Sequence, residues 1–305
     1  MDDGVKVFVG TDRSQLLAVA VLEHSIRRHT ARPVQVCPLI DLDLPEPRDI
    51  RQGSRTNFSF ARFAIPELAG RRGRALYLDA DMLVFRDIGE LWDIPFEGHA
   101  VAIQEQLPAH AQSHLKPGAP AVRVKQCSVM LIDCARAAWD VHEIVGGLDG
   151  RYTYEQLMHG LCILPEREIR YAVPFAWNSL EHFDDATRLI HYTDMDTQPW
   201  VSAANRNGAL WLAEVRLMLD TGALTATELA TEVQLGYFRP SLLHELEETP
   251  HRFGWNAEAA ARYADFDRRA GFVRHAEVYR RKKLRAEAIR RYVADPGAAA
   301  AASHS

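Results

Sequence analysis

The chain has 305 residues, of which 47% are hydrophobic and 25% are charged, and its formal net charge is -5. This length and composition suit one large α/β domain with an appendage, or two small domains, with a sizeable hydrophobic core. The negative charge argues against nucleic acid as the main partner, because neutralising phosphates requires an excess of Lys and Arg.

The N-terminal region predicts a βαβ unit. Residues 5–9 form a short β-favouring run that ends at Gly10. Apolar residues then recur at helical spacing between positions 16 and 26, with Asp12 or Ser14 as the N-cap. Residues 34–40 predict a second strand, and a strand–helix–strand opening favours a mostly parallel sheet.

Two aspartates, Asp79 and Asp81, interrupt an apolar run. Residues 75–78 before them and 82–85 after them are continuously apolar, as in a strand buried on both faces. Burying two unpaired carboxylates costs several kcal/mol each, and a divalent cation removes that cost. The alternative is a solvated turn at the end of a strand, but the flanking apolar runs favour a metal site.

The remaining elements follow in chain order. Strands are expected at 100–103, 129–132 and 188–191, and helices at 57–68, 135–145, 154–161 and 211–219. Between 256 and 293 the pattern is wholly helical, and the alanine-rich end is expected to be disordered. We therefore predict a main domain over residues 1–250, a C-terminal helical extension over 251–293 and a disordered tail over 294–305.

The N-terminal residues lack a basic segment followed by an apolar one, so no signal peptide is expected. No apolar run is long enough to span a bilayer. The four cysteines show no zinc-site spacing, and a reduced state is expected. These features predict a soluble, cytoplasmic protein.

Residues 74–92 read Arg-Ala-Leu-Tyr-Leu-Asp-Ala-Asp-Met-Leu-Val-Phe-Arg-Asp-Ile-Gly-Glu-Leu-Trp, which closely resembles the signature of glycosyltransferase family 8. Segments 7–12, 62–68, 128–133 and 191–200 resemble other family motifs in the same order. The resemblance implies a GT-A fold, a Rossmann-like and mostly parallel sheet flanked by helices. It also implies Mn²⁺ or Mg²⁺ and a nucleotide-sugar donor, by default linked to UDP.

The resemblance also implies site residues. The metal ligands would be Asp79, Asp81 and His191, although a lone His beside a strand is usually structural. The implied catalytic residues are Gln156, near the anomeric carbon, and the two aspartates. The implied donor contacts are Thr11, Asp12, Arg62, Asp79, Ala80, Asp81, Gln126 and Gln198.

Two positions depart from the family. Gln198 stands where the family usually has a Lys that touches the donor diphosphate, so Arg62 or Arg206 would have to supply the positive charge. Gln126 stands where the family has Asn, and its longer side chain would shift the sugar pocket. Trp177-Asn178 resembles a pair that shapes the acceptor side, with a packed aromatic as the alternative. We interpret Asp194 and Asp196 as solvated loop residues rather than extra metal contacts.

These features predict a metal-dependent enzyme that moves a hexose from a nucleotide sugar to a hydroxyl acceptor. Retention of anomeric configuration is implied, and because Gln156 is a poor nucleophile, the leaving phosphate would accept the acceptor's proton. The alternatives are a haloacid-dehalogenase-like phosphohydrolase and a sugar-nucleotide-binding protein without turnover. The acceptor, whether a saccharide, a lipid-linked molecule or a small molecule, would meet variable loops such as 107–124. A homodimer also stays open.

Residues 274–291 combine many Arg and Lys residues with apolar ones. A basic helix of this kind can lie on an anionic membrane surface, which would place the protein at the inner face of a membrane. The favoured alternative is a solvated helix whose apolar stripe packs on the domain.

Overall fold

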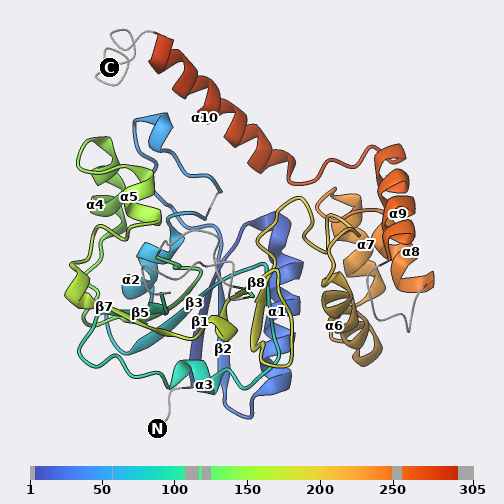
Figure 1. Cartoon of the computed structure of the whole chain (residues 1–305), viewed down its shortest axis with the longest axis horizontal. Helices are drawn as coiled ribbons and strands as arrows, with labels where there is room; N and C mark the ends of the chain where they lie inside the picture. The colour runs from blue at the N-terminus through green and yellow to red at the C-terminus, as the bar shows by residue number, and fades with distance from the viewer. Residues whose placement is uncertain (1–3, 57, 107–116, 119–124, 249–255, 295–305) are drawn as a thin grey trace.

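The structure is a computed structural model that describes residues 4–56, 58–106, 117–118, 125–248 and 256–294. A central sheet is flanked by helices, and the long helix α10 crosses from the side of α6–α9 to the side of α4 and α5 (Figure 1). The predicted disordered tail was 294–305; Ala294 is instead the last residue of helix α10, and residues 295–305 lie outside the described residues, as does most of the variable loop 107–124.

The central sheet has six strands in the order β2-β1-β3-β6-β5-β7. β1 is parallel to β2 and β3, and β5 is parallel to β7, whereas β6 is antiparallel to both of its neighbours. The mostly parallel α/β sheet is therefore confirmed, with β6 as the exception. The strands are β1 Val5–Gly10, β2 Val34–Leu39, β3 Arg74–Asp79, β5 Val101–Gln104, β6 Val129–Asp133 and β7 Ile169–Val173.

A second, small sheet has the order β4-β9-β8. Its strands are β4 Met82–Val84, β8 Ser179–Leu180 and β9 Leu189–His191. β4 and β9 are antiparallel, with Met82 opposite His191. This register brings His191 next to the residue that precedes Met82, which is Asp81.

The helices largely follow the predicted pattern, with shifted ends. The expected helix at 135–145 begins only at Val141, because the Asp140 carboxylate accepts hydrogen bonds from the backbone of His142 and Glu143 and caps the helix there. Neither α7 nor α8 was predicted as a helix. The helices are α1 Leu16–His29, α2 Ile65–Leu68, α3 Gly89–Trp92, α4 Val141–Gly146, α5 Tyr154–Met158, α6 Gly208–Thr221, α7 Ala226–Gln234, α8 Ser241–Glu248, α9 Ala257–Arg269 and α10 Ala276–Ala294.

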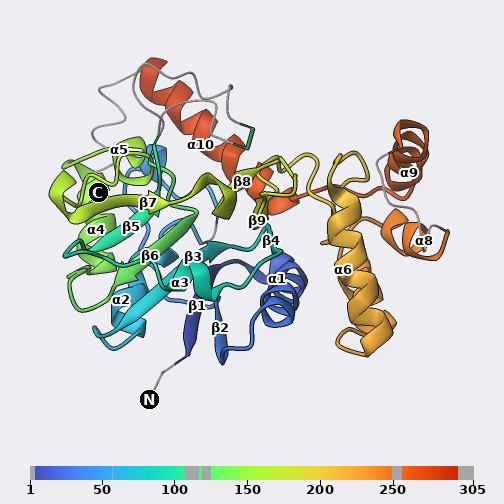
Figure 2. The same cartoon turned by 60° about the horizontal axis from the view of Figure 1, so that its bottom comes forward.

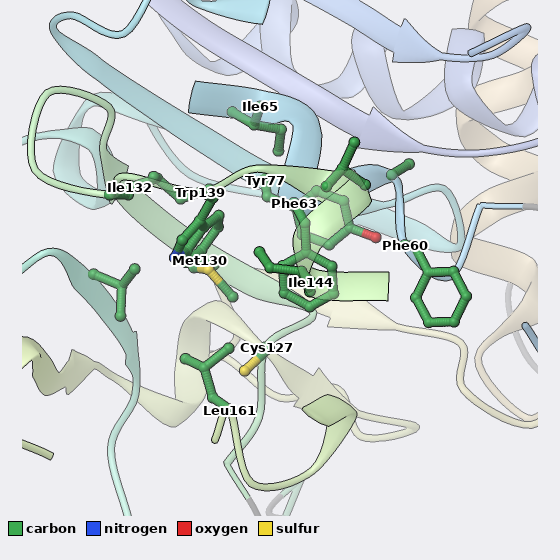
Figure 3. Close-up of a cluster of buried hydrophobic side chains, with 14 of the residues drawn as sticks. Phe60, Phe63, Ile65, Tyr77, Cys127, Met130, Ile132, Trp139, Ile144 and Leu161 are labelled. Atoms are coloured by element: carbon green, nitrogen blue, oxygen red, sulfur yellow. The ribbon is translucent and has the colours of Figure 1, made fainter. Parts of the chain in front are cut away.

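Strand β3 is buried on both faces of the sheet, as its continuous apolar run predicts. Ala75 and Tyr77 belong to one buried cluster, and Leu76 and Leu78 belong to another on the opposite face. The first cluster, drawn in Figure 3, includes Phe60, Phe63, Met130, Trp139 and Ile144. Packing on both faces fixes the direction in which β3 delivers its last residue, Asp79.

Helix α10 docks mainly through polar and cation–π contacts. Arg285 Nε donates to the Arg51 backbone carbonyl at 2.6 Å, and the Arg51 guanidinium lies 3.4 Å from the centroid of the Tyr292 ring. Val278 is the buried apolar residue of this helix, whereas Leu284 is 44% exposed. Contact between the exposed face and a membrane stays a prediction. Among the described residues, no helix combines the length and apolar character needed to cross a bilayer.

We predict that Leu76→Ala lowers the free energy of unfolding by about 2–5 kcal/mol, because Leu76 is fully buried and its removal leaves a cavity beneath β3. The matched control is Leu235→Ala, whose side chain is half exposed and should change stability by less than about 0.5 kcal/mol. Urea denaturation of both variants measures the difference. Equal losses would contradict the assignment of β3 to the core.

Candidate active site

Two neighbouring aspartates and a histidine that is distant in the sequence meet at the end of β3. Asp79 ends β3, Asp81 lies in the turn before β4, and His191 ends β9. Each offers one ligand atom, and these atoms all lie within 4.8 Å of one another. His191 Nε2 is 3.0 Å from Asp81 Oδ1 and 3.9 Å from Asp79 Oδ2. The geometry is that of a three-residue cation site.

Asp79 is held by a chain of two buried side chains. Tyr77 Oη donates to Asp79 Oδ1 at 2.5 Å, and Arg62 Nη2 donates to Tyr77 Oη at 3.1 Å. Burial raises the pKa of Tyr77 well above its usual value, although the charge of Arg62 opposes this. The phenol therefore stays protonated and remains a donor to the carboxylate.

Arg62 lies behind Asp79 rather than in front of it. Its side chain is buried, Nη1 donates to the Cys127 carbonyl at 2.8 Å, and Nη2 is 3.6 Å from Asp79 Oδ1. The sequence suggested that Arg62 helps to hold the nucleotide. In this position its charge acts on Asp79, and a contact between Arg62 and a nucleotide stays a prediction.

Gly10 makes room for this arrangement. A Cβ at position 10 would lie 2.2 Å from Tyr77 Oη, the atom that bonds Asp79. Gly10 is also paired in register with Asp79 across the parallel β1–β3 pair. The residues after Gly10, Thr11 and Asp12, therefore leave the sheet beside the cation site.

The proposed base-binding residues have local roles of their own. Asp12 is the N-cap of the short 3₁₀ helix Arg13–Gln15, and its Oδ1 accepts from Ser14 N at 2.9 Å. Thr11 is buried, and its hydroxyl donates to the Asp12 carbonyl at 3.1 Å. Capping and base contact are compatible, because the cap engages one carboxylate oxygen.

His191 is oriented by Asn178, which is fully buried. His191 Nδ1 lies 2.9 Å from Asn178 Oδ1, and Asn178 Nδ2 donates to Gln104 Oε1 at 3.0 Å. Because Oδ1 can only accept, this network places the ring proton on Nδ1 and leaves the Nε2 lone pair facing the carboxylates. Sequence reasoning assigned Asn178 to the acceptor side and missed this role.

Two opposing effects set the pKa of His191. Burial lowers the pKa of His191, but the carboxylates of Asp81 and Asp79 raise it by more, so the pKa is raised overall. A cation in the same place would replace that proton. Binding of a divalent ion is therefore expected to release a proton from the site.

Gln198 holds Asp81 from the other side. Its Nε2 donates to Asp81 Oδ2 at 2.7 Å and to the Tyr192 carbonyl at 3.0 Å. Both amide hydrogens are therefore engaged within the protein. The residue that replaces the family's Lys is thus part of the site, but it orients a ligand instead of presenting a charge.

Gln156 is exposed at the start of α5, where it forms a capping box with Thr153. Gln156 and Lys125 line an open pocket whose lining includes none of Asp79, Asp81 and His191. Gln126 is half-buried just before β6. The contacts of Gln156 and Gln126 with a sugar stay predictions.

Comparison with known protein sequences identifies a family and a relative. Residues 41–128 match the family model "Glycosyl transferase family 8". The sequence is 30% identical over 229 residues to "Protein CDI" of Arabidopsis thaliana, and the match covers 69% of this chain and 85% of that protein.

Two solved structures share the fold. The bifunctional glycosyltransferase WbbM is 16% identical with a TM-score of 0.52, and the match covers 75% of this chain and 51% of that chain. The glycosyltransferase GlyE of Streptococcus pneumoniae TIGR4 is 15% identical with a TM-score of 0.50, and 83% and 66% are covered. The chain thus spans about half of WbbM and about two-thirds of GlyE, and at these identities the likeness concerns the fold alone.

We predict that Asn178→Leu weakens Mn²⁺ binding by about 10–100-fold, because His191 loses the partner that fixes its tautomer and ring orientation. Isothermal titration with Mn²⁺ measures the effect. The control is Asn205→Leu, which removes another buried amide that bonds Glu181 instead of a candidate ligand. Equal affinities of the Asn178→Leu variant and the wild type would contradict the role of Asn178.

Proposed function

The chain is a glycosyltransferase that belongs to glycosyl transferase family 8, and we propose that it moves a hexose from a UDP-sugar to a hydroxyl acceptor. The observation that carries the proposal is the convergence of Asp79, Asp81 and His191 where β1 and β3 end. Ligands bind at the carboxyl ends of parallel strands in open α/β sheets. Membership of the family replaces the phosphohydrolase alternative.

The three side chains fit a divalent cation. His191 Nε2 and Asp81 Oδ1 are 3.0 Å apart, yet this oxygen is buried without a hydrogen-bond partner in the described structure. Two lone pairs that face each other at this distance repel unless a proton or a cation lies between them. Two carboxylates and one imidazole suit Mn²⁺ or Mg²⁺, with diphosphate oxygens completing the coordination. When bound, the ion supplies Lewis-acid stabilisation of the departing diphosphate.

The contribution of the protein is to hold these groups in place before the donor arrives. Tyr77 orients Asp79, Gln198 orients Asp81 and Asn178 orients His191. Thr11 and Asp12, at the end of β1, are proposed to meet the uracil. Groups that are fixed in advance do not need to reorganise as charge develops in the transition state. This preorganisation is usually the largest contribution to rate enhancement in such sites.

We further propose transfer with retention. A double displacement needs a nucleophilic carboxylate beside the anomeric carbon, and Gln156, the residue that the family resemblance assigns to that position, is an amide. The acceptor hydroxyl would then attack from the face that the diphosphate leaves, and a phosphate oxygen would take its proton. The acceptor itself is proposed only as a hydroxyl compound.

A panel of nucleotide sugars identifies the donor. UDP-sugars with Mn²⁺ are expected to raise the unfolding temperature, because a ligand at 100 times its Kd stabilises the folded state by about 2.7 kcal/mol. The same compounds without Mn²⁺, and GDP- or ADP-sugars with Mn²⁺, serve as controls. Stabilisation by GDP-sugars alone would overturn the assignment of UDP.

We expect Asp81→Asn to lower transfer at least about a hundredfold, because it removes charge from the cation site. Release of UDP and the mass of the product measure turnover. EDTA should inactivate the wild type, and added Mn²⁺ should restore it but not the variant. The control is Asp93→Asn, an exposed aspartate that pairs with Arg32. Near-normal turnover by the Asp81 variant would refute the metal role.

A further inference from the structure

Of the residues at the described donor site that were expected to meet the diphosphate, Gln198 and Arg62 both direct their terminal nitrogens to protein partners. Gln198 directs both of its amide hydrogens to Asp81 and Tyr192. Arg62 is buried, and its terminal nitrogens bond Cys127 and Tyr77. A diphosphate is bound most strongly by charged or strongly polarised donors. A further donor for the diphosphate would therefore have to come from another element that reaches this edge of the sheet.

His275 lies in the connection between α9 and α10. Its Nε2 is buried and has no hydrogen-bond partner in the described structure. Its backbone is left-handed, with a φ of 45°, which is uncommon for a residue other than glycine. A buried polar atom without a partner is costly, and a strained backbone that presents such an atom points to a ligand.

The connection is tied to the loop that leaves the cation site. Arg274 Nε lies 3.1 Å from Asp196 Oδ1, and Arg274 Nη1 donates to the Asp196 carbonyl at 3.0 Å. The Tyr279 hydroxyl donates to the same carboxylate. Asp196 follows His191 by five residues, and in Figure 2 the first turn of α10 lies beside β8 and β9. Asp196 is thus an anchor for the C-terminal extension.

The charged surroundings of His275 agree with this placement. Burial lowers the pKa of His275 overall, and Lys282 acts in the same direction, although the carboxylates of Asp12 and Asp81 oppose this shift. Asp12 stands at the proposed base end of the donor site, and Asp81 stands at its metal end. The imidazole is therefore close to both ends, where the diphosphate of a bound nucleotide sugar would lie.

We propose that His275 is a donor-binding residue whose Nε2 binds the diphosphate, in place of the Lys that the family carries at position 198. The inference rests on the proposed function, because it requires a nucleotide donor. The Met195 backbone hydrogen-bonds the ring and leaves Nε2 for the ligand. The ring takes up a proton from solvent as the diphosphate binds, so that Nε2 donates to a phosphate oxygen and the phosphate charge compensates the buried imidazolium.

The test compares His275→Asn with His275→Gln. Asn tolerates the left-handed backbone and retains a polar atom near the position of Nδ1, but it has nothing at the position of Nε2. Gln carries an amide nitrogen that can reach that position. The matched control is Arg280→Gln on the exposed face of α10, where Arg280 pairs with Glu277.

Isothermal titration with UDP and Mn²⁺ measures the affinities. His275→Asn should weaken UDP binding about tenfold or more, as expected for loss of a charge-assisted hydrogen bond. Uridine binding and the unfolding temperature of the free protein should not change. His275→Gln should recover part of the affinity, and Arg280→Gln should bind UDP like the wild type.

Several results would overturn the inference. If His275→Asn bound UDP as tightly as the wild type, His275 would not contact the diphosphate. If the variant lost as much affinity for uridine as for UDP, the contact would be with the nucleoside. A lower unfolding temperature of both His275 variants without ligand, with no recovery by Gln, would make the role structural. Failure of the wild type to bind any nucleoside diphosphate with Mn²⁺ would instead overturn the proposed function itself.

Discussion

The structure depends on holding two carboxylates and an imidazole within 4.8 Å of one another at one edge of a sheet. Such a cluster is unfavourable unless a proton or a cation lies between its members, because otherwise its lone pairs repel and its charges are partly removed from water. Each member has a buried polar partner: Tyr77 for Asp79, Gln198 for Asp81 and Asn178 for His191. Two sheets supply the framework, since β3 ends at Asp79, Asp81 lies between β3 and β4, and the antiparallel β4–β9 pair places the histidine. Much of the surrounding packing keeps these elements in register.

The replacement of a lysine by Gln198 changes how the site manages charge. A lysine would add a positive charge close to Asp81 and the diphosphate, whereas the amide gives Asp81 a neutral donor that also bonds Tyr192. Asp81 is thus held in place by the amide, but the pocket carries less positive charge than it would with a lysine. The C-terminal extension reaches the same region through Arg274 and Tyr279. The loss of a positive charge at position 198 and the presence of the C-terminal extension at the same site are therefore connected in our proposal.

Sequence patterns predicted those helices and strands whose own residues indicate which side is buried. The βαβ opening, the buried strand β3 and the helical C-terminal region follow from hydrophobic periodicity, and the acidic pair follows from its place in an apolar run. β7 was missed because Arg170 and Tyr171 leave it only partly apolar. The small sheet was missed as a sheet because its strands have two or three residues. The roles of Asn178, Tyr77 and His275 were not predictable, since each depends on register or on contacts between distant segments.

Helix α10 also bears on how the protein folds as it is made. Arg285 bonds the backbone of Arg51 across 234 positions of sequence, so this contact cannot form until residue 285 has left the ribosome. Until then, the segment around Arg51 and the loop that carries Asp196 lack the helix that later spans them. Closing so long a loop costs entropy that local contacts do not repay. Docking of this helix is therefore expected to be a late event in biogenesis, after the sheet and its acidic edge have formed.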